Sequence, residues 1–361
     1  MQDFTYEELL LRDDLTWIDV RSPGEWVESA MPGAINVPLF DNDERALIGT
    51  IYKHESPEAA RELGVRIYGE KLPELVAALH EAIAGRTAAV YCWRGGMRSK
   101  TVALLVELMG LPVVRLAGGY RAYRQHVTAS LAAISPASLP PLIVIHGMTG
   151  VGKTMLLERL AKRGLPVLDL EAYACHRGSV FGSIGLTPTN QRQFDSLLFA
   201  ALRRWQGAPY LFMEAESKRI GHVSMPDGLF AAKLAGVNVE VTADLLTRVE
   251  RTLLQYQLAD AQVFATEVRR AVERIERRFS PDLRKRCFAN LEAGNYHALV
   301  SDLLDEYYDP RYRHAMLQYE YGFLQIDGTD LDTAVDQLAH LAESGQLLDW
   351  LEEKKKASQS V

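Results

Sequence analysis

Short apolar runs alternate with amphipathic stretches along the first third of the chain. The runs at 15–20, 88–92 and 112–116 have the length and composition of buried strands. Helical periodicity marks the stretches at 71–84 and 99–109 between them. Because strands that alternate with helices form parallel sheets, the pattern predicts an α/β domain.

A second series of the same kind follows a proline-rich stretch. Prolines in 135–141 lack a backbone donor and block helix continuation, so we expect a linker there between a domain at 1–134 and a domain at 142–361. From about residue 243 the second domain is expected to be mainly helical and charged. The elements predicted before that point are strands at 142–146, 166–170 and 210–214 and a helix at 154–163.

The composition is that of a globular protein, with 48% hydrophobic and 24% charged residues among 361. The sequence has no apolar run of membrane-spanning length and no basic leader before an apolar stretch, so we expect a cytoplasmic protein without a membrane partner. A formal charge of -7 argues against a surface that binds nucleic acid all over. It still allows one local basic face.

Residues 267–286 are the candidate for that face, because they hold eight Arg or Lys against four Asp or Glu. Arg270, Arg274, Arg277 and Arg278 recur at helical spacing and predict one stripe that suits the phosphates of RNA. An exposed helix laced with Glu–Arg pairs has the same pattern, so that alternative stays open.

Cys92 ends an apolar strand and is followed by the residues WRGGMRSKT, in which two glycines allow a tight turn before a helix. Backbone N–H groups at this helix start, with Arg94 and Arg98 nearby, would stabilise a thiolate or a bound oxyanion. We therefore expect Cys92 to be a nucleophile. Cys175 and Cys287 lack such surroundings, and the spacing of the three cysteines predicts neither a disulfide framework nor a zinc site.

Four motifs in order resemble the rhodanese family: IDVRSPGEW (18–26), MPGAINVPL (31–39), VYCWRGGMRS (90–99) and RLAGGYRAY (115–123). They predict a rhodanese-like parallel-sheet domain. Asp19 and Arg21 follow the first strand and either brace the cysteine loop or form an ordinary surface turn.

The cysteine loop departs from the usual sulfurtransferase length. Cys92 to Arg98 spans seven residues, the C-x5-R length of rhodanese-like phosphatases, where the sulfurtransferase loop has six. A longer loop holds a larger tetrahedral anion, so we expect a phosphate-bearing donor such as selenophosphate to bind there.

The sequence GMTGVGKT fits G-x-x-x-x-G-K-[ST] between a predicted strand and a predicted helix, the context that a P-loop requires. Gly147, Gly150 and Gly152 let backbone N–H groups face a phosphate, Lys153 supplies a positive charge, and Thr154 is a candidate Mg²⁺ ligand. The motif predicts a P-loop NTPase-like domain. It recognises a diphosphate and leaves open whether the ligand is ATP or another phosphate ester.

Carboxylates gather at the ends of the strands that follow. Glu214 closes an apolar strand and is a candidate for the Walker-B place, with Glu216 one same-face position further on. A solvated strand end is the alternative. Asp169 and Glu171 end the preceding strand in the same way.

The loop at 174–185 follows those carboxylates and is a candidate substrate loop. It contains His176, Arg177 and Ser179 among glycines. No second set of ligands stands at zinc-like spacing, so we expect no metal there, and a plain loop histidine remains an alternative for His176.

Both motifs, together with the segments at 44–64, 168–182, 212–226 and 307–319, resemble the tRNA 2-selenouridine synthase family over nearly the whole chain. The resemblance implies replacement of sulfur by selenium in the 2-thiouridine of a tRNA anticodon loop. Selenophosphate would be the donor, with selenophosphate synthetase as its source. It also implies geranyl transfer from geranyl diphosphate to that sulfur, which reassigns the P-loop to a prenyl diphosphate, and it implies no tightly bound cofactor.

Two further readings remain. A phosphatase-like Cys92 loop coupled to a P-loop kinase would act on another substrate and would not need the basic stripe. A non-enzymatic alternative is a nucleotide-gated RNA-binding module with an inactive rhodanese domain. The intact Cys92 at the start of the loop argues against it.

Overall fold

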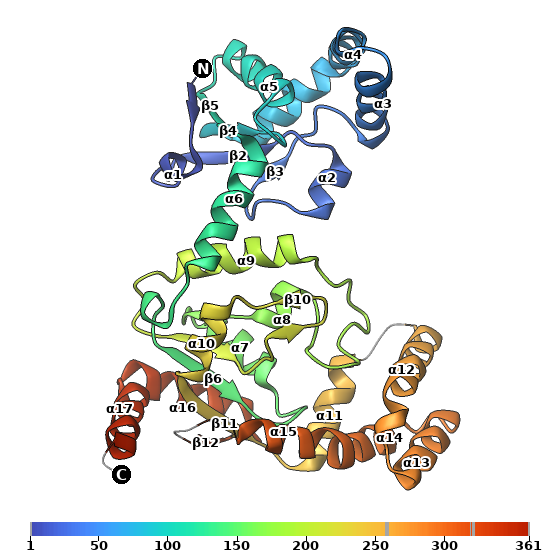
Figure 1. The fold of residues 1–361 in the computed structure, drawn as a ribbon, viewed down its shortest axis with the longest axis vertical. Coiled ribbons are helices and arrows are strands. Elements are labelled where there is room, and N and C mark those ends of the chain that lie inside the picture. The colour runs from blue at the N-terminus through green and yellow to red at the C-terminus, as the bar shows by residue number, and fades with distance from the viewer. Residues whose placement is uncertain (1, 257–259, 318, 320–321, 360–361) are drawn as a thin grey trace. The chain divides into compact units, whose positions relative to one another are not determined.

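The computed structural model describes residues 2–256, 260–317, 319 and 322–359 (Figure 1). The chain divides into two compact units, one of residues 1–131 with 195–199 and the other of residues 132–194 and 200–361. No helix of the described residues combines the length and the apolar composition needed to cross a bilayer.

The first unit is built on a five-stranded parallel sheet with the order β1-β5-β4-β2-β3. The three strands expected from the apolar runs form its centre. The two edge strands were not predicted, because segments of two or three residues carry too little periodicity to be recognised. The strands are β1 (Gln2–Phe4), β2 (Leu15–Asp19), β3 (Ile35–Asn36), β4 (Thr87–Tyr91) and β5 (Val113–Leu116).

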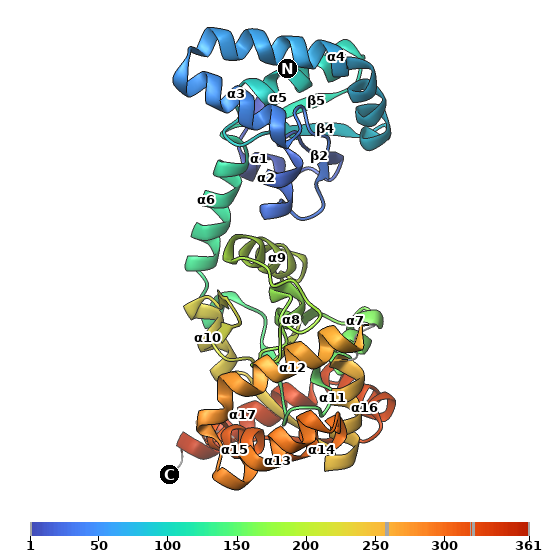
Figure 2. The ribbon, with the colours of Figure 1, turned by 90° about the vertical axis from the view of Figure 1, so that its right-hand side faces the viewer.

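Helices connect the strands of this sheet and pack against it, and α3 and α4 pack against each other (Figure 2). The helix expected at 71–84 is the second half of a much longer one that begins at Pro57. Ile18, Leu79, Val90 and Val102 are fully buried between helices and sheet. The helices are α1 (Tyr6–Leu9), α2 (Pro23–Glu28), α3 (Asn42–His54), α4 (Pro57–Ile83), α5 (Met97–Leu108) and α6 (Gly119–Ala132).

A buried ion pair lies where β2 ends. Asp19 and Arg21 are both 0% exposed, and the Arg21 guanidinium donates to Asp19 at 2.6 to 3.0 Å and to the Ser29 carbonyl at 2.8 Å. The same guanidinium lies 3.8 Å from the centre of the Tyr120 ring. The surface-turn alternative for this pair is therefore wrong.

The second unit has a parallel sheet of five strands in the order β12-β11-β6-β8-β7. The strand expected at 166–170 is shorter, because α8 already begins at Leu170. Two strands of this sheet, β11 and β12, and both strands of a hairpin were missed, and β12 lies in the part expected to be helical. The strands are β6 (Leu142–His146), β7 (Val167–Leu168), β8 (Leu211–Glu214), β11 (Val237–Thr242) and β12 (Leu324–Asp327), and a hairpin adds β9 (Arg219–Ile220) and β10 (Val223–Ser224).

One face of this sheet packs on α7, α16 and α17, which share a core with Ile143, Phe212 and Val239. Leu156 and Leu338 are fully buried in that core. The helices around the sheet are α7 (Lys153–Lys162), α8 (Leu170–Ala174), α10 (Asp227–Leu234), α16 (Leu331–Glu343) and α17 (Gln346–Gln359). The helix α9 (Gln191–Arg204) is divided, because its residues 195–199 belong to the first unit.

The remaining helices form a group of their own with a separate apolar core (Figure 1). Cys287 lies in that core, where burial raises the pKa of its thiol to about 12. These elements are α11 (Leu245–Tyr256), α12 (Ala261–Ile275), η2 (Glu276–Arg278), α13 (Pro281–Glu292), α14 (Tyr296–Asp302), the π-helical turn η3 (Leu303–Tyr308) and α15 (Asp309–Met316). Two α/β units, the second with a mainly helical C-terminal part, confirm the fold class expected from the sequence.

The Asp19–Arg21 pair predicts a large loss of stability when it is broken. Asp19→Ala leaves a buried guanidinium without its counter-ion, a change that costs about 3–5 kcal/mol. Hydrogen exchange of the β4 amides in the full chain should accelerate accordingly. Glu58→Ala, which breaks the exposed pair with Arg61 in α4, is the control and should leave β4 protected. Equal exchange in the two variants would contradict the assignment.

Candidate functional site

Cys92 lies immediately after β4 and is 3% exposed. Its thiol donates a hydrogen bond to the hydroxyl of Ser99, 3.3 Å away, and the Ser99 hydroxyl donates to the Gly96 carbonyl at 3.1 Å. Ser99 is fully buried in the first turn of α5. The nucleophile candidate is thus held at the start of a helix, as the sequence predicted, but its polar partner is a serine that the sequence analysis did not single out.

The start of α6 fixes the shape of the cysteine loop. Backbone N–H groups of Tyr120 and Arg121 donate to the carbonyls of Cys92 and Trp93 at 2.8 and 2.9 Å. A Cβ on Gly119 would lie 2.2 Å from the Cys92 carbonyl oxygen. Only glycine permits this approach, which is the physical reason for the second glycine, Gly119, in the last rhodanese-like motif.

The two arginines of the loop differ in their partners. The Arg98 guanidinium donates to both carboxylate oxygens of Glu25, at 2.6 and 3.2 Å. Burial would raise the pKa of Glu25, but Arg98 outweighs it and the pKa is lowered. Arg94 is exposed, and the described residues offer it no ion pair. Arg94 is therefore free to meet an anion, while Arg98 is positioned by Glu25.

The P-loop in the second unit runs from β6 to α7 with three glycines at positive φ: 141° at Gly147, 84° at Gly150 and 99° at Gly152. A Cβ on Gly147 or Gly150 would lie 2.5 Å from a backbone oxygen of β11 or α11. The Lys153 ammonium donates to the Gly147 carbonyl at 2.9 Å. The side chain of Lys153 thus bonds back to the first residue of its own loop.

Two arginines of α11 hold the carbonyls of this loop. Arg248 donates to the Thr149 carbonyl at 2.9 Å and Arg251 donates to the Val151 carbonyl at 2.8 Å. Arg248 in turn makes a bidentate ion pair with Asp309, at 2.9 and 2.6 Å, and each side chain is 5% exposed. The sequence analysis missed this support, because its members lie about 60 and 100 positions from their partners in the chain.

A chain of hydrogen bonds joins the end of the phosphate loop to two carboxylates. The Thr154 hydroxyl donates to Glu171 at 2.9 Å. The Glu171 amide donates to Glu214 at 2.8 Å. Glu214 is 1% exposed, and its second oxygen has no hydrogen-bond partner among the described residues, so it is not a solvated strand end. Burial and the charge of Glu216 raise the pKa of Glu171 to about 7, and burial also raises the pKa values of Glu214 and Glu216.

The loop at 174–185 is divided between two roles. Arg177 lies 4.8 Å from the centre of the Tyr256 ring, and the Ser179 hydroxyl is 3.2 Å from the Tyr256 hydroxyl. His176 packs instead against Gly182 and Gly221, and burial lowers its pKa. Arg177 and Ser179 therefore border the P-loop, whereas His176 is a packed loop histidine.

These residues surround a polar cavity of about 590 Å³, its mouth included. Positive charge comes from Lys153, Arg177 and Arg251, and negative charge comes from Glu171 and Glu216. The glycine loop forms its floor.

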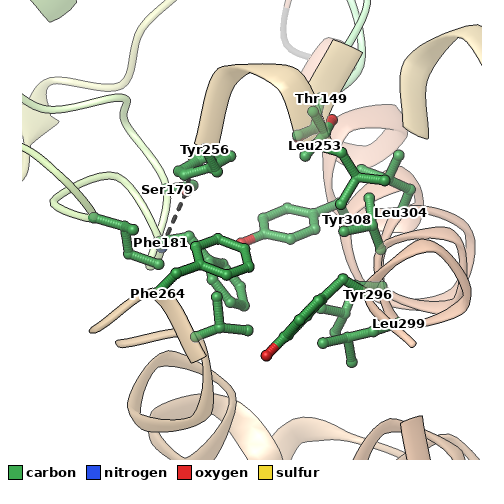
Figure 3. Close-up of a pocket in the computed structure, with 15 residues that line it drawn as sticks. Thr149, Ser179, Phe181, Leu253, Tyr256, Phe264, Tyr296, Leu299, Leu304 and Tyr308 are labelled. Carbon is green, nitrogen blue, oxygen red and sulfur yellow. Dashed lines mark hydrogen bonds between the residues drawn. The ribbon is translucent and has the colours of Figure 1, made fainter. Parts of the chain in front are cut away.

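An apolar pocket of about 550 Å³ adjoins that cavity, and both are lined by Thr149, Ser179 and Tyr256 (Figure 3). Nothing in the sequence predicted it, because its walls come from segments spread over 150 positions that only the fold brings together. The other labelled lining residues are Phe181, Leu253, Phe264, Tyr296, Leu299, Leu304 and Tyr308.

The four arginines of the expected basic stripe do not all lie on one helix. Arg270 and Arg274 are on α12, which ends at Ile275, and Arg277 and Arg278 are on η2. All four are exposed. Arg270 pairs with Glu267 at 2.9 Å, as the alternative anticipated, whereas Arg274, Arg277 and Arg278 have no ion pair within the described part of the chain.

A parallel sheet with a cysteine loop, followed by a sheet with a phosphate loop, defines a rhodanese-like domain joined to a P-loop domain. Family models support both parts. The model described as a rhodanese-like domain matches residues 5–126, and the model described as the tRNA 2-selenouridine synthase AAA domain matches residues 140–339.

Similar proteins extend the agreement over most of the chain. A tRNA 2-selenouridine synthase of Chromohalobacter salexigens is 31% identical over 86% of this chain and 90% of its own length. Those of Hydrogenovibrio crunogenus and Pseudomonas syringae are 33% and 31% identical, over 87% and 94% of this chain and 92% and 98% of their own lengths. The chain belongs to the tRNA 2-selenouridine synthase family.

Gly119 offers a test of the cysteine loop. Gly119→Ala puts a methyl group against the Cys92 carbonyl and should displace the loop, so alkylation of Cys92 by iodoacetamide should change rate at least several-fold. Gly33→Ala is the control, because Gly33 also has a positive φ, of 80°, but has open space around it. Mass spectrometry of the Cys92 peptide gives the rate. Unchanged alkylation in Gly119→Ala would show that this contact does not shape the loop.

Proposed function

We propose that the protein replaces the sulfur of 2-thiouridine at the wobble position of tRNA by selenium, with selenophosphate as donor and an S-geranyl intermediate made from geranyl diphosphate. The names of its relatives support the selenium transfer. The observation that carries the geranyl step is the apolar pocket that opens beside the P-loop and shares Thr149, Ser179 and Tyr256 with it.

This pocket suits a hydrocarbon chain better than a nucleoside. Most of its wall consists of aliphatic and aromatic side chains such as Leu253, Phe264 and Leu299. A base and a ribose need several polar partners when they are buried, since each unpaired polar group costs free energy. A prenyl chain has no such need and gains from the burial.

The charged cavity suits the diphosphate of the same molecule. Lys153 and the loop amides would bind its oxygens, and the Lys153 bonds to loop carbonyls would be exchanged for phosphate. Arg177 and Arg251 add charge from the facing wall. The oxygens of Thr154 and Glu171 fit the preference of Mg²⁺, which would help to neutralise the leaving diphosphate.

Thr149, Ser179 and Tyr256 line both the apolar pocket and the charged cavity, so their hydroxyl groups lie where the two meet. Within the described part of the chain, the buried Thr149 hydroxyl has no hydrogen-bond partner. A prenyl diphosphate bound across the two cavities places its C1–O bond at this junction. The Thr149 hydroxyl would then donate to the departing oxygen.

In the alkylation step the thiocarbonyl sulfur attacks C1 of the geranyl group. The C1–O bond breaks with its electron pair going to diphosphate, and the N3 proton of the base is released. Alkylation turns the sulfur into a leaving group. The selenium of selenophosphate then attacks C2, the C2–S bond breaks with its electron pair, and the geranyl thiolate takes up a proton and departs as geranylthiol. Water cleaves the remaining P–Se bond, which releases inorganic phosphate, leaves selenium on C2 and returns a proton to N3.

We assign the selenium step to the Cys92 loop. Arg94 and the loop amides bind the phosphate oxygens of selenophosphate, Arg98 is set in place by Glu25, and Cys92 lies at the base of the same loop. The seven-residue loop, which has the length found in phosphatases, supports a tetrahedral anion as ligand.

Because the two steps are assigned to different sites, the P-loop and the Cys92 loop, we expect their defects to be separable. Cys92→Ser should accumulate geranylated tRNA and form no selenouridine, because alkylation does not use the thiol. Lys153→Ala should form neither geranylated tRNA nor selenouridine in quantity. Geranylation should fall by at least about two orders of magnitude, as is usual when a group that stabilises the charge of the leaving group is removed. Mass spectrometry of nucleosides from tRNA incubated with each variant measures both products. The opposite pattern would overturn the assignment.

We also propose that Arg274, Arg277 and Arg278 contact tRNA phosphates. Replacing Arg277 and Arg278 together by Ala should weaken tRNA binding and lower the slope of log affinity against log salt by about two. The matched control replaces Arg284 and Arg286, which are engaged by Glu276 and Asp302. Filter binding at several salt concentrations gives the slopes. A change of equal size in the control pair would refute the contact.

A further inference from the structure

The wall of the apolar pocket opposite Thr149 includes Tyr296, which packs against a second lining residue, Phe264 (Figure 3). Phe264 of α12 and Tyr296 of α14 meet edge to face, with ring centroids 4.9 Å apart and planes at 67°. Figure 3 shows Thr149 on one side of the pocket, Tyr296 and Leu299 on the opposite side, and the Tyr308 ring between them. The pocket thus has a charged mouth and an aromatic end wall.

A ligand whose diphosphate is fixed at the P-loop can enter this pocket only as far as the end wall. The diphosphate position is set by Lys153 and the glycine loop, so chain length and pocket depth must match. Each further isoprene unit adds five carbons, which have to be accommodated beyond the point where the chain already ends. The packed core offers no free space for them.

We propose that the Phe264–Tyr296 pair sets the chain length of the isoprenoid that the protein transfers, by closing the pocket to allylic diphosphates longer than geranyl. The inference rests on the proposed function and adds the residues that determine specificity. Chain length would be controlled at the junction of two helices, α12 and α14, rather than at the phosphate loop.

These two residues are better placed for this role than the rest of the wall. Leu299, Leu303 and Leu304 are only 1 to 4% exposed and belong to or adjoin the core of the helical group, so they cannot give way. Phe264 and Tyr296 are partly exposed and pack on the edge of that core. Trimming either ring therefore extends the pocket outward and leaves the core filled.

The test is a competition between geranyl and farnesyl diphosphate for one thiouridine-containing tRNA with the full-length protein. The wild type should transfer mainly the geranyl group. Phe264→Ala and Tyr296→Ala should each raise the farnesyl-to-geranyl product ratio by about tenfold or more, the scale on which pocket size discriminates substrates. Tyr296→Trp should depress geranyl transfer while the five-carbon dimethylallyl group is still transferred.

Phe279→Ala is the matched control. Phe279 also packs edge to face, on Tyr307 at 5.3 Å, and lies in the same helical group, but it does not line the pocket. Its product ratio should equal that of the wild type. Phe264→Leu and Tyr296→Leu, which keep an apolar side chain, replace the alanine variants should those fail to fold.

Three outcomes overturn the proposal. Unchanged ratios in variants that remain active would show that the pair does not limit chain length. An equal shift in Phe279→Ala would show that the helical group had merely loosened. A wild type that alkylates tRNA with none of these diphosphates would remove the proposed function itself, and the inference with it, which is a result distinct from the first two.

Discussion

The second unit depends on a single buried ion pair, Arg248 with Asp309. Its guanidinium is bound on one side by the Asp309 carboxylate and on the other by the Thr149 carbonyl of the phosphate loop. Breaking such a pair leaves an uncompensated buried charge, which costs free energy. The pair therefore holds three segments together: α11, α15 and the phosphate loop. With these segments it fixes the walls of the apolar pocket.

This constraint explains how the phosphate loop comes to have an apolar wall beside it. The glycine loop alone recognises a diphosphate and is indifferent to what the diphosphate carries. What makes the site specific is the wall that Arg248 brings beside it, with Tyr256 and Ser179 at the boundary between charged and apolar surface. The proposed alkylation of sulfur would use that combination, because its leaving group is highly charged and its transferred group is a hydrocarbon.

The sequence was informative where function resides in contiguous motifs. The cysteine loop, the phosphate loop and the two α/β series were all recognised from local residue patterns, because glycines at positive φ and strand-to-helix turns are local properties. Features made by tertiary contact were not. Glu25 and Arg98 are 73 positions apart, Arg248 and Asp309 are 61 apart, and no local pattern links either pair.

The same distinction accounts for the errors. β12 pairs in parallel at the edge of the sheet and is four residues long, so it carries little signal within a charged helical region. The arginine stripe was read as continuous, whereas Phe279 and the preceding η2 turn end the helix after Ile275. Equal spacing in the sequence did not reveal that break.

The central claim is that the P-loop and the apolar pocket together bind a prenyl diphosphate. Isothermal titration of the full-length protein with geranyl S-thiolodiphosphate, a non-ionising analogue, and with ATP tests it most directly. The account predicts that the analogue binds at least tenfold more tightly than ATP, that inorganic diphosphate competes with it, and that Lys153→Ala abolishes the binding. Tighter binding of ATP, with no heat from the prenyl analogue, would contradict the account.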